Sequence, residues 1–259
     1  MAGLSALMFR SRGSTNVASP PRTVIAIPLD PARIALVLWS ATVAVAGLGL
    51  LRQIYIYSFG EHTALHTLRI FSLDGELTLP AWYSSMLMWT AAALLALHAL
   101  CAAPAQPSTR RYWWALAAIF AYLSLDESVN LHELAGRLLP NDVHYLPMFG
   151  FRWVLAFAPL LVLGGLAFLP FLFRLPRDIA RRMVVSGAVY VGGAYGMELV
   201  GGYIASTSGV HGRGYLAEVV VEETLEMVGL TLFVLVLIDL LALQARRAPA
   251  APEGQEHSS

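Results

Sequence analysis

The chain has 259 residues, of which 57% are hydrophobic and 13% are charged, and its formal net charge is zero. Soluble domains carry about 25% charged residues, so this composition excludes an ordinary soluble domain and predicts an integral membrane protein. We expect the lipid bilayer, and no nucleic acid, as its partner. The single cysteine, Cys101, excludes a disulfide within the chain and is expected to be a small buried side chain.

Six apolar segments follow one another, each long enough to cross about 30 Å of hydrocarbon. Backbone polar groups in lipid must be satisfied within each segment, and the alternation typical of membrane barrels is absent, so we expect helices. The predicted fold is all-α, a polytopic membrane bundle of six transmembrane helices over residues 34–243. A cytoplasmic N-terminal tail (1–33) and a disordered cytoplasmic C-terminal tail (244–259) flank it. The six segments are residues 34–57, 81–103, 112–133, 153–173, 183–206 and 219–243.

Arginines gather in alternate connections of this arrangement, on the side that holds both termini. This side carries Arg10, Arg12, Arg22, Arg33, Arg110, Arg111, Arg174, Arg177, Arg181, Arg182, Arg246 and Arg247. The opposite loops carry Arg69, Arg137, Arg152 and Arg213. Because basic residues favour the cytoplasmic side of a membrane, we expect both termini in the cytoplasm.

Carboxylates occur at one depth in three of the predicted helices. At about 1.5 Å per residue, Asp126 lies about 21 Å from the cytoplasmic end of its helix, Glu198 about 22 Å and Glu226 about 25 Å. Polar groups at this depth are costly unless they face one another or a cavity. We therefore expect an acidic pocket between the third, fifth and sixth helices, open to the outer side.

The spacing of further polar residues supports this pocket. Asp126, Asn130 and Glu133 follow i, i+4, i+7, which places them on one stripe of a continuous helix. Glu218, Glu222 and Glu226 form a second stripe, and Glu223 neighbours Glu226. Three alternatives explain the carboxylates without a pocket. The third helix ends in solvent, and the helix dipole stabilises the glutamates at the start of the sixth helix. Glu198 is a structural residue that pairs with Arg52 or Tyr195.

Carboxylates packed together require protons or a cation, because Arg52 and His132 can neutralise two at most. Carboxylates with a histidine and an asparagine suit hard or borderline cations, so we predict a divalent metal ion of undefined identity. The paired Glu-x-x-His of di-iron bundles, the zinc-protease motifs and Gly-x-Ser-x-Gly are absent. The candidate ligands are Asp126, Glu127, His132, Glu198, Glu222, Glu223 and Glu226, with Asn130, Glu133, Arg52 and Tyr195 as supporting residues.

Three functions remain open for such a protein. A metal-dependent membrane enzyme would activate water or oxygen on a lipid or a small periplasmic substrate. A proton- or cation-coupled carrier would load and release ions at the same carboxylates, although no inverted repeat is apparent. A non-catalytic accessory membrane subunit would use the polar groups to specify helix packing.

Two other features indicate packing within the bundle. Gly192 and Gly196 form a small-xxx-small pair, which predicts close contact between helices. His98 stands alone among apolar residues of the second segment, and we expect a structural role for it.

Three groups of motifs resemble a bacterial family of uncharacterised multi-span membrane proteins. They are Leu73-Asp-Gly-Glu76 with Pro80-Ala-Trp-Tyr-Ser-Ser85, Leu123-Ser-Leu-Asp-Glu127 with His132-Glu133, and Glu222-Glu-Thr-Leu-Glu-Met-Val-Gly229. The resemblance covers roughly residues 50 to 230. It implies a six-helix protein of the bacterial inner membrane and supports treating these residues as one set, and it supplies no reaction.

Overall fold

The computed structural model describes residues 30–60, 68–75, 77–102, 107–132, 134, 152–210 and 212–247. Within them every regular element is helical, which confirms the predicted all-α class. The helices all belong to one compact unit, Pro31–Ser259. They are α1 (Pro31–Phe59), the 3-10 helix η2 (Arg69–Phe71), α2 (Leu79–Cys101), α3 (Pro107–Val129), α5 (Arg152–Leu172), α6 (Arg177–Val191), the π-helix η5 (Gly192–Met197), α7 (Glu198–Ser208) and α8 (Arg213–Arg247).

Four helical stretches are long and apolar enough to cross a membrane, which indicates a membrane protein. They are Pro31–Phe59, Leu79–Cys101, Arg177–Ser208 and Arg213–Gln244, and they correspond to four of the six predicted segments. α5 contains a shorter apolar stretch, Phe157–Leu172. Large apolar side chains such as Leu36 on α1 and Leu163 on α5 are more than 60% exposed, as expected where helices face lipid.

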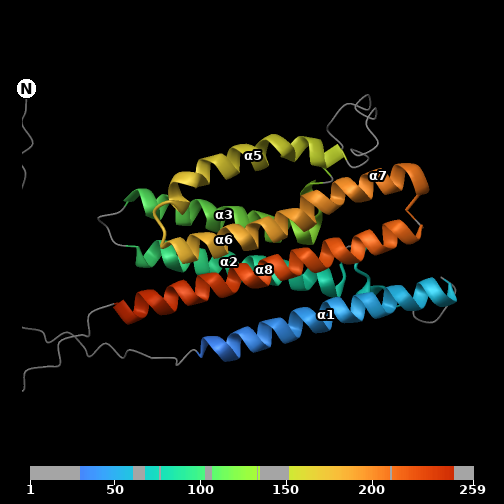
Figure 1. Cartoon of the computed structure of the whole chain (residues 1–259), viewed down its shortest axis with the longest axis horizontal. Coiled ribbons are helices and arrows are strands. Elements are labelled where there is room, and N and C mark those ends of the chain that lie inside the picture. Colours follow the sequence, from blue (N-terminus) through green and yellow to red (C-terminus); the bar gives the residue numbers. More distant parts are fainter. Residues whose placement is uncertain are drawn as a thin grey trace, which may run out of the picture. The chain divides into compact units, whose positions relative to one another are not determined.

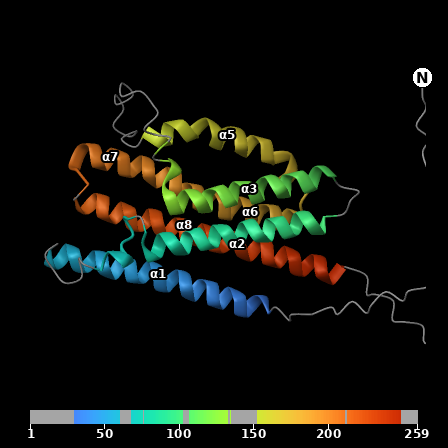
Figure 2. The ribbon, with the colours of Figure 1, turned by 180° about the vertical axis from the view of Figure 1, so that it is seen from behind.

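The long helix α8 is the centre of the bundle, in contact with α1, α2, α6, η5 and α7. α2 packs on α3 from the other side, while α1 and α5 lie at opposite edges (Figures 1 and 2). The end of α8 and the starts of α1, α3 and α6 lie at one end of the bundle (Figure 1). The carboxyl end of α3 and the start of α5 lie toward the other end, where the candidate site is found.

Hydroxyl groups hold the buried helices together. Thr42 Oγ1 on α1 lies 2.9 Å from the Tyr83 hydroxyl on α2 and 2.7 Å from Thr231 Oγ1 on α8. Ser85 Oγ donates to the Ser124 carbonyl, and Ser124 Oγ donates to the Ser85 carbonyl, which joins α2 to α3. Such bonds fix helix register in an apolar bundle, where apolar burial by itself discriminates poorly between registers.

Glycines allow α8 and its neighbours to approach closely, although they are not the predicted pair. A Cβ on Gly229 of α8 would lie 2.5 Å from the Tyr190 backbone nitrogen of α6, and one on Gly193 would lie 2.9 Å from the Glu222 carbonyl oxygen. The expectation for Gly192 and Gly196 was wrong. A Cβ on Gly192 would meet no atom within 4 Å, and one on Gly196 would meet only a carbonyl oxygen of its own helix at 4.0 Å.

The third predicted segment ends earlier than its apolar pattern suggests. α3 stops at Val129, and Asn130 adopts φ 53°, a left-handed conformation that asparagine accepts more readily than most residues. The unbroken helix predicted from Asp126 through Glu133 is therefore wrong, although Asp126 and Asn130 both line the cavity described below. Glu133 lies outside the described residues. Cys101, expected to be buried, is exposed at the end of α2. His98 has the expected structural role, buried against Trp113 and bonded to the Leu237 carbonyl.

The predicted tails lie largely outside the described residues. α1 already begins at Pro31, inside the predicted tail 1–33, and α8 continues to Arg247, past the predicted boundary at residue 243.

Candidate functional site

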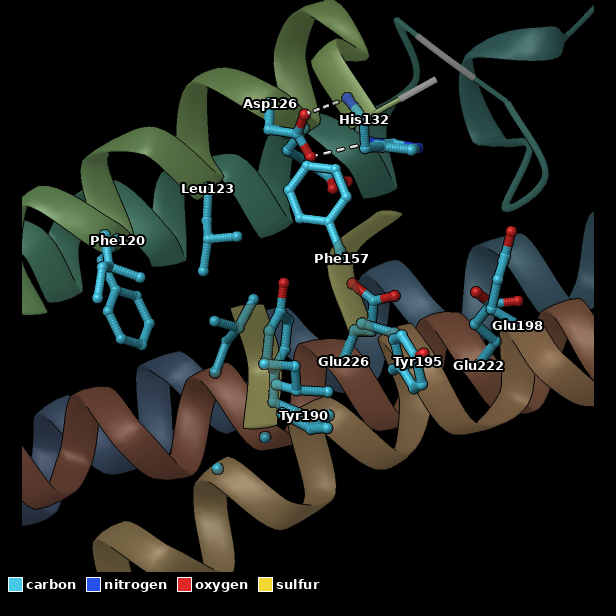
Figure 3. Close-up of a pocket in the computed structure, with 18 of the residues that line it drawn as sticks. Phe120, Leu123, Asp126, His132, Phe157, Tyr190, Tyr195, Glu198, Glu222 and Glu226 are labelled. Atoms are coloured by element: carbon cyan, nitrogen blue, oxygen red, sulfur yellow. Dashed lines mark hydrogen bonds and ion pairs between the residues drawn. The ribbon is translucent and has the colours of Figure 1, made fainter. Parts of the chain in front are cut away.

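A cavity of about 1,320 Å³ lies between α3 and α5 on one side and α6, η5, α7 and α8 on the other (Figure 3). Its two parts differ in chemistry. The acidic end is lined by Asp126, Glu127, Asn130, His132, Trp153, Tyr195, Glu198, Glu222, Glu223 and Glu226, with Arg69 and Asp74 from the loop before α2. The apolar part is lined by side chains that include Phe120, Leu123, Phe157, Phe168, Phe171 and Phe233.

The end of α3 places Asp126 and His132 as a pair. Because the chain turns at Asn130, His132 folds back over the last turn of α3. The backbone N–H of His132 donates to Asp126 Oδ1 at 2.7 Å, and its ring Nδ1 lies 2.9 Å from Asp126 Oδ2 (Figure 3). One carboxylate therefore holds both the backbone and the ring of His132.

Trp153, at the start of α5, connects this pair to Glu198. Its ring meets the His132 ring edge to face at a centroid distance of 4.9 Å. Its indole N–H donates to Glu198 Oε1 at 2.9 Å. Since an indole N–H is a donor that needs a partner when partly buried, Trp153 fixes the position of one carboxylate of the site.

The π-helix η5 brings Glu198 and Tyr195 to the cavity. Single-turn π-helices insert an extra residue into an α-helix and often occur at functional sites. The Tyr195 hydroxyl donates to the Val154 carbonyl of α5 at 3.0 Å, so that η5 is attached to α5 as well. Gly193, on the opposite face of η5, lies against the backbone of α8 at Glu222.

Three glutamates enter the cavity from α8: Glu222, Glu223 and Glu226. Glu226 is buried, with 9% exposure, and Glu222 lies beside Glu198 (Figure 3). Glu218, one turn before Glu222, is not among the lining residues. It is buried against Gly201 of α7, and its Oε1 atom has no hydrogen-bond partner among the described residues.

The apolar part of the cavity is built mainly from aromatic rings. Phe120 of α3 and Phe233 of α8 stack with a centroid distance of 4.7 Å and an interplanar angle of 3°. Phe168 and Phe171 of α5 pack edge to face beside them. Tyr190 of α6 stands at the boundary between the two parts (Figure 3).

The structure brings most of the predicted site residues into one cavity. Asp126, Glu127, Asn130, His132, Tyr195, Glu198, Glu222, Glu223 and Glu226 all line it. Arg52 does not. Its guanidinium donates to the Leu68 carbonyl and to Ser72 Oγ, and Glu198 instead accepts from Trp153, which contradicts the alternative in which Arg52 pairs with Glu198.

Sequence reasoning missed Trp153, the donor to Glu198, because a tryptophan at the start of a membrane segment is normally assigned to the interface. It also missed Tyr190, Tyr215 and Arg69, which no spacing had selected, and it did not name Asp74 as a site residue although the Leu73–Glu76 motif contains Asp74.

Carboxylates outnumber basic side chains among the described residues of the acidic end. Six carboxylates lie with Arg69 and with His132, which pairs with Asp126; they are Asp126, Glu127, Glu198, Glu222, Glu223 and Glu226. In the part of the chain that the structure describes, no group of three His, Cys, Asp or Glu side chains is gathered closely enough to hold a metal ion as it stands.

A family model described as "Domain of unknown function (DUF8692)" matches residues 33–240, which include every helix of the cavity. No curated protein and no solved structure matches the chain.

Proposed function

The chain belongs to the family described as a domain of unknown function (DUF8692), and because this description names no activity, we propose a function from the cavity itself. The protein is an integral membrane protein that binds a divalent cation at the acidic end of its cavity. The bound cation serves metal-dependent chemistry on a molecule held in the same cavity.

The proposed topology has six membrane spans. Besides the four long apolar stretches, α3 has 23 residues and α5 has 21, which corresponds to about 35 Å and 32 Å at 1.5 Å per residue, enough to cross the hydrocarbon core. Arg110 and Arg111 at the start of α3 and Arg177 at the start of α6 lie at the same end of the bundle as the end of α8 (Figure 1). By the positive-inside rule we place this end, where α1 begins and α8 ends, on the cytoplasmic side of a bacterial inner membrane, and we propose that both termini are cytoplasmic.

One observation carries the cation proposal: six carboxylates lie with Arg69 and His132 among the described residues that line the acidic end. Ionised carboxylates that lie together in a partly desolvated site repel one another, and a divalent cation removes this repulsion at several of them at once. Oxygen ligands with one imidazole form a set that hard and borderline divalent ions accept.

The proposed core ligands are Asp126, Glu198 and Glu226, one from each wall of the acidic end. The ion takes its remaining ligands from Glu127, His132, Glu222 and Glu223. Since no three of the described side chains are already gathered around one point, binding requires the carboxylates to turn toward the ion. Trp153 and Asn130 support two of these walls, the first by its bond to Glu198 and the second by the turn that places His132.

The apolar part of the cavity favours this function over a carrier. A cation carrier needs a polar path to the cytoplasmic side, whereas beyond Tyr190 the described lining residues are phenylalanine, leucine and other apolar side chains apart from Ser186, whose hydroxyl donates to the Met183 carbonyl. An accessory subunit whose carboxylates only specify packing is the other alternative, and it would bind no metal.

The test is the metal content of the full chain, purified in detergent without chelators and measured by inductively coupled plasma mass spectrometry. We expect about one ion per chain and a loss of at least tenfold in Glu198→Gln and in Glu226→Gln. Asp178→Asn, which changes an exposed carboxylate at the start of α6, should keep the metal. A folded wild-type protein that carries no metal and takes up none of added Mg²⁺, Mn²⁺, Ca²⁺ or Zn²⁺ would refute the proposal.

A further inference from the structure

The cavity as a whole is too large to be a packing defect. Protein interiors contain few voids larger than a water molecule, and sites for drug-sized ligands measure about 300–1,000 Å³. The cavity here measures about 1,320 Å³ and continues past the acidic end along α5 as far as Leu172. Apolar walls of this extent lose contact energy unless another apolar group fills the space.

The helix α5 lies between the cavity and the edge of the bundle that faces lipid. Leu160 of α5 lines the cavity and is nevertheless 63% exposed. It lies eight residues into the helix, about 12 Å from its start, and therefore at membrane depth. Its neighbour Leu163, which does not line the cavity, is equally exposed at 63%. A single helix at the edge of the bundle thus separates the cavity from the surrounding hydrocarbon (Figures 1 and 2).

The apolar part is long enough to hold a hydrocarbon chain. From Phe157 to Leu172 the lining side of α5 extends about 22 Å at 1.5 Å per residue, which exceeds the roughly 15 Å that one lipid leaflet contributes to the 30 Å hydrocarbon core. On α8 the apolar lining continues from Leu230 to Phe233, below the carboxylate of Glu226.

We propose that this part of the cavity holds the hydrocarbon chain of a membrane amphiphile whose head group carries amine or hydroxyl donors. The chain lies between the phenylalanines of α3, α5 and α8, and the head group lies at the acidic end beside Glu222, which is not one of the proposed core ligands of the cation. An anionic head group without donors is disfavoured, because the carboxylates of the acidic end outnumber the positive charges even when one divalent cation is bound. The inference deepens the proposed function and rests on one part of it, the molecule held in the cavity, while the bound cation is tested separately.

Three glycines can be replaced by larger residues to test the proposal without disturbing the helix packing. Gly164 and Gly165 of α5 and Gly187 of α6 line the cavity, and a Cβ on any of them would meet no atom within 4 Å. Larger side chains there should enter the space reserved for the hydrocarbon. Gly47 of α1 also has no atom within 4 Å and does not line the cavity, so it provides the matched control.

The experiment uses the full chain in detergent and a long-chain amine that carries a photoactivatable diazirine in its hydrocarbon. We expect crosslinks to peptides of α5 and α6, at least tenfold weaker in Gly164→Phe/Gly187→Phe and unchanged in Gly47→Phe. If the double variant does not fold, the single variants Gly164→Leu and Gly187→Leu should each reduce labelling several-fold. Labelling of the folded cavity variants at the wild-type level would overturn the proposal.

A second arm tests the head group, with the fatty acid of the same chain length as the probe. We expect the amine to label at least ten times more strongly than the fatty acid, and equal labelling would refute the assignment of the acidic end to the head group. Metal content is measured on the same samples. If the protein carries no metal but is labelled as described, this inference stands and the cation proposal is refuted. If the protein carries metal but the glycine variants are labelled as strongly as the wild type, the cation proposal stands and this inference is refuted.

Discussion

Asp126 contacts His132 twice, through the backbone N–H at Oδ1 and through ring Nδ1 at Oδ2, at 2.7 Å and 2.9 Å. The two residues are six positions apart, and the turn at Asn130 brings them together. The pair therefore closes the end of α3 and orients an imidazole in the same step.

We predict that Asp126→Asn keeps the fold while Asp126→Ala does not keep it fully. The asparagine Oδ1 can still accept the backbone N–H of His132, whereas alanine removes both contacts. Hydrogen bonds to charged groups contribute about 1.5–3 kcal/mol, so Asp126→Ala should lower the free energy of unfolding by about that amount. Thermal unfolding in detergent, followed by circular dichroism, measures the difference. Equal stability of the two variants would show that the backbone contact contributes little.

Trp153→Phe is predicted to release Glu198 without disturbing the aromatic packing. Phenylalanine retains a ring against His132 but lacks the N–H that donates to Glu198 Oε1. We expect a loss of about 1 kcal/mol in unfolding free energy, the usual net value of one hydrogen bond. We also expect weaker metal binding, because Glu198 loses the group that positions it. Trp114→Phe changes an exposed tryptophan of α3 and should alter neither measurement.

From the depth of each residue in its helix, the sequence predicted that Asp126, Glu198 and Glu226 would share a cavity. A carboxylate inside a membrane helix is costly unless it meets another polar group or a cavity. The same argument failed for Arg52. Its long side chain reaches the loop at Leu68 and Ser72, and loop positions cannot be inferred from helix depth.

The sequence could not have shown where regular helix geometry stops. The stripe of Asp126, Asn130 and Glu133 assumed an unbroken helix, and the turn at Asn130 depends on contacts that form only when His132 meets Asp126. The sequence likewise gives no periodic signal for the π-helix before Glu198. The extra residue of a π-helix rotates all following side chains to a different face of the helix.

The glycines of the α6–α8 interface lead to a third prediction. Gly229→Ala should be strongly destabilising, because the added Cβ would lie 2.5 Å from the Tyr190 backbone nitrogen, and backbone cannot rotate away. Overpacking of this kind costs about 1–3 kcal/mol or more. Gly192→Ala, where a Cβ meets no atom within 4 Å, should be neutral or slightly stabilising. The comparison is made by thermal unfolding of both variants, and a Gly192→Ala variant as unstable as Gly229→Ala would contradict the assigned contacts.

The single cysteine tests the proposed orientation of the bundle. Cys101 is exposed at the end of α2, the end at which α3 and its arginines begin. If this end faces the cytoplasm, a membrane-impermeant maleimide should label Cys101 in inside-out vesicles and leave it unlabelled in intact spheroplasts. Ser208→Cys in a Cys101→Ser background places the thiol at the exposed end of α7, at the opposite end of the bundle, and should give the reverse pattern. Labelling of Cys101 from outside would reverse the orientation and place the acidic end of the cavity on the cytoplasmic side.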